Sequence, residues 1–247
     1  MTEPHHDRGM RLVESLVAGA AGATLGRLVG GLLGREEGWI AAGVAGANGL
    51  ISGWRRIYSW RTSKGWVAFV LDSTWAIFTT LAGLVAHLVA TVTGGRYEAS
   101  LSARQDRHVY RGGARLKRRF ALTLGNVVSN AGDVDGARRR RLVTDHEAVH
   151  VWQARWLGPI YPVVYVGWAV IGAIVGAATW LVRGRRERLG TVVETFAYYC
   201  NPCEWWAYSR DANWPPKGKA AGMGWTRPAT RAFSAVAVVV DPHGDGS

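Results

Sequence analysis

The sequence has few cysteines and few lysines. Its two cysteines, Cys200 and Cys203, form a single Cys-x-x-Cys, which excludes a disulfide-stabilised scaffold and does not fix the redox compartment. Only four of the 30 basic residues are lysine, so the net charge of +12 comes mainly from arginine. Arginine-rich usage also reflects genome composition, and no RNA- or DNA-binding motif accompanies the charge. The sequence therefore predicts no nucleic-acid partner.

Apolar residues make up 48% of the 247 residues and fall into long blocks separated by basic segments. This distribution is typical of a membrane protein rather than of an even globular core. Basic clusters beside apolar blocks suit anionic lipid head groups, so membrane lipids are the expected partners. The N-terminal segment shows no convincing cleavage site, and we expect an uncleaved membrane segment there.

Residues 1–93 are the predicted membrane region. Within 12–54, glycines recur every four residues, a spacing that lets two helices approach closely as a glycine-zipper hairpin and gives a surface for homo-oligomers. A Gly/Ala-rich interfacial or soluble hairpin is the alternative. Residues 66–93 are expected to form one spanning helix, with Asp72 and His87 reaching toward head groups.

Residues 94–210 are the second predicted domain, followed by a tail over 211–247 with a strand at 235–240. The fold class is α+β and mainly α: membrane helices, then a small sheet with helices behind it. This domain is expected to contain a β-hairpin over 107–117 turning at Gly112-Gly113, a strand over 120–128, and a helix over 138–156. Residues 160–182 form a further apolar block.

The predicted helix over 138–156 contains His146-Glu147-x-x-His150. Residues four apart lie on one helix face, so the two imidazoles can share a metal ion, and Glu147 can reach a water bound to it. Catalytic zinc needs a third protein ligand and keeps one position open. The candidate donors downstream are Glu187, Glu194, Cys200, Cys203, Glu204 and Asp211.

His-Glu-x-x-His-x-x-Gln followed by Asn-Pro-x-Glu-x-x-Ala-Tyr over residues 201–208 resembles small bacterial metallopeptidase-like proteins of the gluzincin type. The resemblance covers about residues 106–210. It implies a zincin-like domain in a bacterial cell-membrane protein, with Zn²⁺ bound by His146, His150 and Glu204. Gln153 and Tyr208 would be supporting residues. Cys203 departs from the family pattern.

Two other ligand sets remain open. Glu194 is a reserve third ligand, and Cys200 and Cys203 with the two histidines would make a closed Cys2His2 structural site. The function expected from the resemblance is a membrane-associated zinc metallopeptidase, in which Glu147 acts as general base on a peptide or protein substrate. The alternatives are a non-catalytic membrane scaffold or assembly protein that retains a zincin fold, or a glycine-zipper protein with an accidental motif.

The two motifs impose a condition on the apolar block between them. If residues 160–182 crossed a bilayer once, His150 and Glu204 would end on opposite sides and could not share a metal, so the metal site predicts that this block does not cross fully. The metal site therefore predicts either a re-entrant hairpin bending near Gly172 or Gly176, or an apolar helix packed on other helices at the membrane surface.

Overall fold

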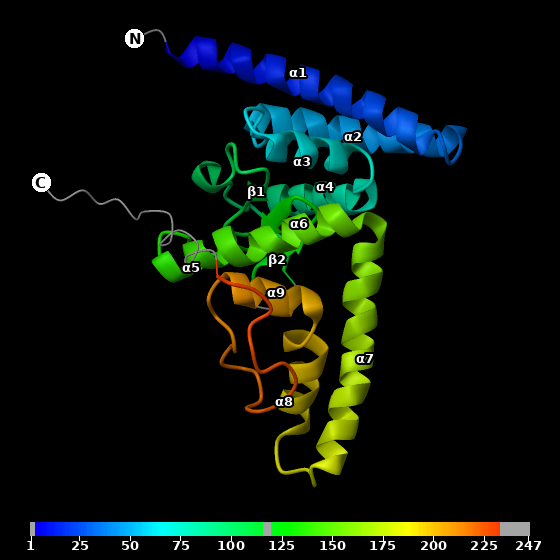
Figure 1. Ribbon diagram of the computed structural model, residues 1–247. Coiled ribbons are helices and arrows are strands. Elements are labelled where there is room, and N and C mark those ends of the chain that lie inside the picture. The colour runs from blue at the N-terminus through cyan, green and yellow to red at the C-terminus, as the bar shows by residue number, and fades with distance from the viewer. Residues whose placement is uncertain (1–2, 116–119, 233–247) are drawn as a thin grey trace, which may run out of the picture. The chain divides into compact units, whose positions relative to one another are not determined.

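A computed structural model describes residues 3–115 and 120–232, and the strand expected at 235–240 lies outside this part. The chain forms two compact units, Met1–Pro159 and Ile160–Ser247. The prediction of a mainly helical chain with a small sheet is confirmed (Figure 1). Two helical stretches are long and apolar enough to cross a membrane, Asp7–Gly30 and Ala137–Val182.

The first unit begins with a helical hairpin of α1 (Glu3–Gly30) and α2 (Arg35–Arg55). Glycine is required where the two backbones meet, because a Cβ on Gly26 would lie 2.5 Å from the carbonyl oxygen of Ala41. Small residues on both helices thus allow a separation that larger side chains would prevent.

The helix expected over 66–93 is divided into α3 (Ser63–Ser73) and α4 (Ile77–Val92), which meet at 89°. Thr74 at the break has non-helical φ and ψ of −135° and −96°. The hydroxyl of Thr80 donates to the carbonyl oxygen of Asp72 over 2.8 Å, which braces the bend. The sequence does not show this break, because hydropathy indicates which residues avoid water and not the direction in which the chain runs.

Asp72 and His87 do not reach outward as expected, since their exposed fractions are 1% and 6%. Asp72 accepts two hydrogen bonds of 2.8 Å from Arg155, and the Tyr58 hydroxyl donates to it over 2.9 Å. His87 shares a 2.8 Å hydrogen bond with the Tyr110 hydroxyl. Paired burial offsets the cost of removing these polar groups from water, and that pairing depends on residues far away in sequence.

The sheet contains three short strands in the order β1-β3-β2: β1 (His108–Val109), β3 (Val127–Ser129) and β2 (Leu122–Leu124). Residues 116 and 117 of the hairpin expected over 107–117 lie outside the described part, and its first strand has other partners than expected: β1 pairs in parallel with β3, and Tyr110 bridges Tyr97. The strand expected over 120–128 is itself a hairpin, turning at Gly125, whose φ is +55°. Gly-Asn between apolar runs is a two-residue turn signal.

Of the remaining helical elements of the first unit, η1 (Ala99–Leu101) precedes the sheet in the chain and the others lie between the sheet and Pro159. The others are α5 (Ala137–Arg141), the π-helical segment η2 (Leu142–Glu147), α6 (Ala148–Leu157) and the start of η3 (Gly158–Ile160). Buried apolar side chains of the sheet and of this helical run form one core, which includes Val109, Val128, Val143 and Val151. The helix bearing the first motif is therefore anchored on the sheet.

The second unit is built on α7 (Tyr161–Val182), a single helix with no break at Gly172 or Gly176, so the expected bend is wrong. The chain instead turns and returns beside α7 through α8 (Leu189–Glu194) and the π-helical η4 (Thr195–Tyr199), as Figure 1 shows. The glycines allow this contact: a Cβ on Gly176 would lie 2.8 Å from the Cα of Val193. The small residues mark helix packing, not a bend.

Candidate metal centre

His146 and Glu147 lie at the end of η2, and His150 lies in the first turn of α6. The helix expected over 138–156 is present as the consecutive elements α5, η2 and α6, and it is π-helical over Leu142–Glu147. A π-helical turn inserts extra backbone into a helix, which changes the direction of the side chains that follow, and such turns often lie at functional sites. The His-x-x-x-His spacing is retained across the junction.

The two imidazoles face each other, with His146 Nε2 and His150 Nε2 separated by 3.3 Å. Their exposed fractions are 3% and 5%. His150 Nδ1 lies 2.9 Å from the amide oxygen of Gln153, which can only accept, so Nδ1 carries the proton. His150 Nε2 then presents its lone pair, as a metal ligand must.

Glu147 is buried and its carboxylate is held by a residue of the sheet. The Thr123 hydroxyl on β2 donates to Glu147 Oε2 over 2.7 Å. Sequence analysis missed Thr123, because the pair is separated by 24 residues and nothing in a short strand marks one threonine from another. The hydrogen bond restricts the rotation of the side chain predicted to be the general base.

Glu204 lies in the first turn of α9 (Pro202–Arg210), in the second unit. Asn201 caps this helix by accepting from the Cys203 backbone N–H over 3.1 Å, and Pro202 suits the first helical position. The Asn-Pro of the second motif therefore fixes where the helix starts and places Glu204. The Tyr165 hydroxyl on α7 donates to Glu204 Oε1 over 2.6 Å.

Two further tyrosines lie near Glu204. The hydroxyls of Tyr198 and Tyr208 are 3.4 Å apart. Burial, and next the nearby charge of Glu204, raise the pKa of both phenols above the usual value. Both side chains are therefore protonated at neutral pH and can donate a hydrogen bond, as a residue supporting a developing negative charge must.

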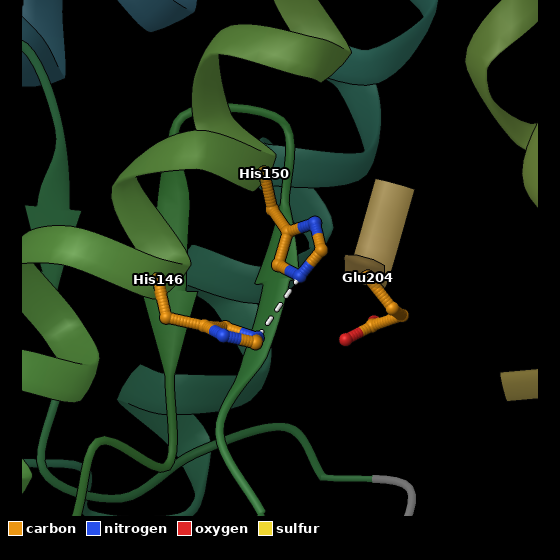
Figure 2. A group of neighbouring side chains, drawn as sticks. All are labelled: His146, His150 and Glu204. Atoms are coloured by element: carbon orange, nitrogen blue, oxygen red, sulfur yellow. Dashed lines mark hydrogen bonds between the residues drawn. The ribbon is translucent and has the colours of Figure 1, made fainter. Parts of the chain in front are cut away.

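The structure brings together His146, His150 and Glu204 as a buried group that could hold a metal ion. One ligand atom from each of the three lies within 4.8 Å of the other two, and Figure 2 shows the rings and the carboxylate directed toward a common point. Two imidazoles and one carboxylate are a donor set that zinc binds, and three protein ligands leave a fourth position open. These residues thus fit the metal that the resemblance implies.

The alternative ligands are not members of this group. Among the described residues, the cluster contains neither Glu194 nor either cysteine. Cys200 and Cys203 are both buried, and neither forms a disulfide within the described residues. Burial, and next the charge of Glu204, raise the pKa of the Cys203 thiol to about 11. These facts favour Glu204 over a Cys2His2 site.

Comparisons of the chain with protein-family models, with curated proteins and with solved structures found no match.

Proposed function

We propose that this protein is a membrane-associated zinc metallopeptidase of the gluzincin type, with a zincin-like arrangement of sheet and helices around the site. The observation that carries the proposal is the buried group of His146, His150 and Glu204, with their ligand atoms within 4.8 Å of one another, next to the buried Glu147.

Each residue has a defined role in this proposal. His146, His150 and Glu204 would hold the ion, and bound zinc would supply a water of lowered pKa and polarise a carbonyl. Glu147 would act as the general base: it would accept a proton from the attacking water, whose oxygen bonds to the peptide carbonyl carbon, and return the proton to the amine that leaves as the C–N bond breaks. Thr123 keeps the Glu147 carboxylate in place, and Gln153 keeps His150 in the tautomer that binds a metal.

The membrane part of the proposal rests on exposed apolar side chains. The stretches Asp7–Gly30, in α1, and Ala137–Val182, which includes α7, are long and apolar enough to cross a bilayer. In the most apolar 18 residues of each stretch, only 28% and 11% of the residues are buried. Large side chains exposed on α7 include Val163, Val166, Val170, Ile174 and Val182. Such a face is stable in contact with lipid, so we propose a multi-pass location in a bacterial cell membrane.

The proposal is tested on the full chain purified in detergent micelles. Zinc content is measured by elemental analysis, and hydrolysis is measured with casein and with a fluorogenic peptide library. We expect one zinc per chain in the wild type. His150→Ala should lose zinc and activity, whereas Glu147→Gln should keep zinc and lose at least about 100-fold in rate, the usual contribution of a general base.

Glu194→Gln is the matched control, because it removes a carboxylate from the same unit but outside the metal-binding group, and it should change neither quantity. A wild-type protein without stoichiometric zinc would end the proposal. Zinc binding without hydrolysis by the wild type would leave the non-catalytic scaffold with structural zinc. Unchanged hydrolysis in Glu147→Gln would remove the base assignment.

A further inference from the structure

Tyr165 lies one turn into α7, in a helix that is otherwise almost wholly apolar. Its hydroxyl is directed at Glu204 and donates to Oε1 over 2.6 Å, within the second unit. The separation of 39 residues means that no sequence motif contains both. A phenol near the start of an apolar helix is ordinarily explained as an interfacial anchor, but this one is only partly exposed and bonded to a buried carboxylate.

The geometry around this hydrogen bond is fixed from both sides. Asn201 donates from its side-chain nitrogen to the carbonyl oxygen of Tyr165 over 3.1 Å. The side-chain oxygen of the same Asn201 accepts from the Cys203 N–H at the start of α9. One residue therefore joins the backbone at Tyr165 to the helix turn that carries Glu204.

The contact between α7 and the returning chain is also close elsewhere. The Trp168 indole N–H donates to the carbonyl oxygen of Phe196 over 3.1 Å. A Cβ on Gly172 would overlap that same carbonyl oxygen. The first half of α7 is therefore held against the segment that leads to Glu204, so the Tyr165 hydroxyl is positioned by packing and does not depend on the hydrogen bond alone.

We propose that Tyr165 is a positioning residue for the metal ligand: its hydroxyl orients the Glu204 carboxylate for coordination. The inference rests on the proposed zinc site. A hydrogen bond to Oε1 restricts the rotation of the Glu204 carboxylate. Partners that orient metal ligands in this way typically contribute 10–100-fold to metal affinity. The apolar helix α7 thereby belongs to the metal centre through one oxygen atom.

The test compares the wild type with Tyr165→Phe in detergent micelles. The probe is Zn²⁺ alone, titrated in competition with a fluorescent chelator of known affinity. Tyr165→Phe keeps the ring and removes only the hydroxyl, and we expect a 10–100-fold loss of zinc affinity. The absorption spectrum of the Co²⁺-substituted protein should change as well, because the geometry of the carboxylate ligand changes.

Two further variants separate positioning from packing. Tyr165→Leu removes the ring and the hydroxyl together. Because the hydroxyl is the group that orients Glu204, this variant should lose no more zinc affinity than Tyr165→Phe. Thr179→Val removes a hydroxyl on α7 that bonds only within its own helix, to the carbonyl of Val175, and should leave zinc affinity unchanged.

The outcomes distinguish this inference from the proposed function. Tight zinc binding by the wild type and equal binding by Tyr165→Phe would overturn the inference alone. A loss confined to Tyr165→Leu would also overturn it, because the ring and not the hydroxyl would then be the cause. Absence of stoichiometric zinc in the wild type would overturn both.

Discussion

The ion pair between Asp72 and Arg155 gives the sharpest prediction about stability. Both side chains are almost fully buried, at 2% and 1% exposure, and two hydrogen bonds of 2.8 Å join them. Arg155 belongs to α6, the helix that carries His150, and Asp72 ends α3 before the bend. The pair therefore holds the metal-binding helix on the broken α3–α4 helix.

Asp72→Asn removes one charge and leaves the Arg155 guanidinium buried without its counter-ion. Breaking a buried pair in this way costs about 3–5 kcal/mol. We expect the lower half of this range, because Arg155 also donates to the carbonyl oxygen of Asp106 over 2.5 Å. A loss of about 3 kcal/mol lowers the ratio of folded to unfolded protein by roughly 100-fold.

Replacing both charges should recover most of this loss. Asp72→Leu with Arg155→Met removes the uncompensated charge, and such apolar replacements are often neutral or stabilising. The recovery should be incomplete, because Tyr58 loses the acceptor that it bonds over 2.9 Å, a cost of about 1–3 kcal/mol for a buried donor. The double variant should thus be more stable than Asp72→Asn and less stable than the wild type.

The measurement is urea unfolding in detergent micelles, followed by tryptophan fluorescence. Asp135→Asn is the matched control: this carboxylate also pairs with an arginine, Arg111, at 2.7 Å, but it is 68% exposed, so its loss should change stability little. The reasoning is refuted if the free energy of unfolding of Asp72→Asn lies within about 1 kcal/mol of the wild-type value. It is also refuted if the double variant loses as much stability as Asp72→Leu and Arg155→Met, measured singly, lose in sum.

Three further predictions concern other parts of the chain. Thr123→Val should lower kcat roughly tenfold with zinc content unchanged, because a hydrogen bond to charged Glu147 contributes about 1.5 kcal/mol or more, and Thr123→Ser should restore it; an unchanged kcat would contradict the role. Gly172→Ala should cost about 1–3 kcal/mol by overpacking, measured by urea unfolding, whereas Gly167→Ala, with open space around its Cβ, should not destabilise; equal effects would refute the packing argument. Burial, and next nearby positive charge, lower the pKa of His108. Below about pH 6.5 only the unfolded chain therefore gains this proton, and the free energy of unfolding should decrease as the pH is lowered. His108→Gln should reduce this dependence of stability on pH.

Local sequence patterns predicted those features that depend on neighbours within a few residues. The spacing of His146 and His150 placed two imidazoles on one helix face, and the Asn-Pro before Glu204 marked a helix start. Apolar blocks predicted helices at α1 and α7 because helix formation and burial follow local composition. The Gly-Asn turn between β2 and β3 is also a local pattern, but the hairpin was predicted at Gly112-Gly113 instead.

Features that depend on distant partners were decided by the tertiary structure. Asp72 was assigned to the head-group region, yet its partner Arg155 is 83 residues away. Thr123 and Tyr165 were assigned no role, although each donates to a carboxylate of the candidate site. A single hydrogen bond between distant residues produces no repeating sequence pattern, because it needs only one donor residue and one acceptor residue.

Composition and motif spacing are enough to predict membrane-length apolar helices and a metal at His-Glu-x-x-His. They do not show how the chain returns after residues 160–182, where α7 runs unbroken and the chain comes back along it at Gly172 and Gly176. The physical reason is that composition fixes which segments avoid water, whereas the direction of a chain is fixed by the turns and close contacts between segments.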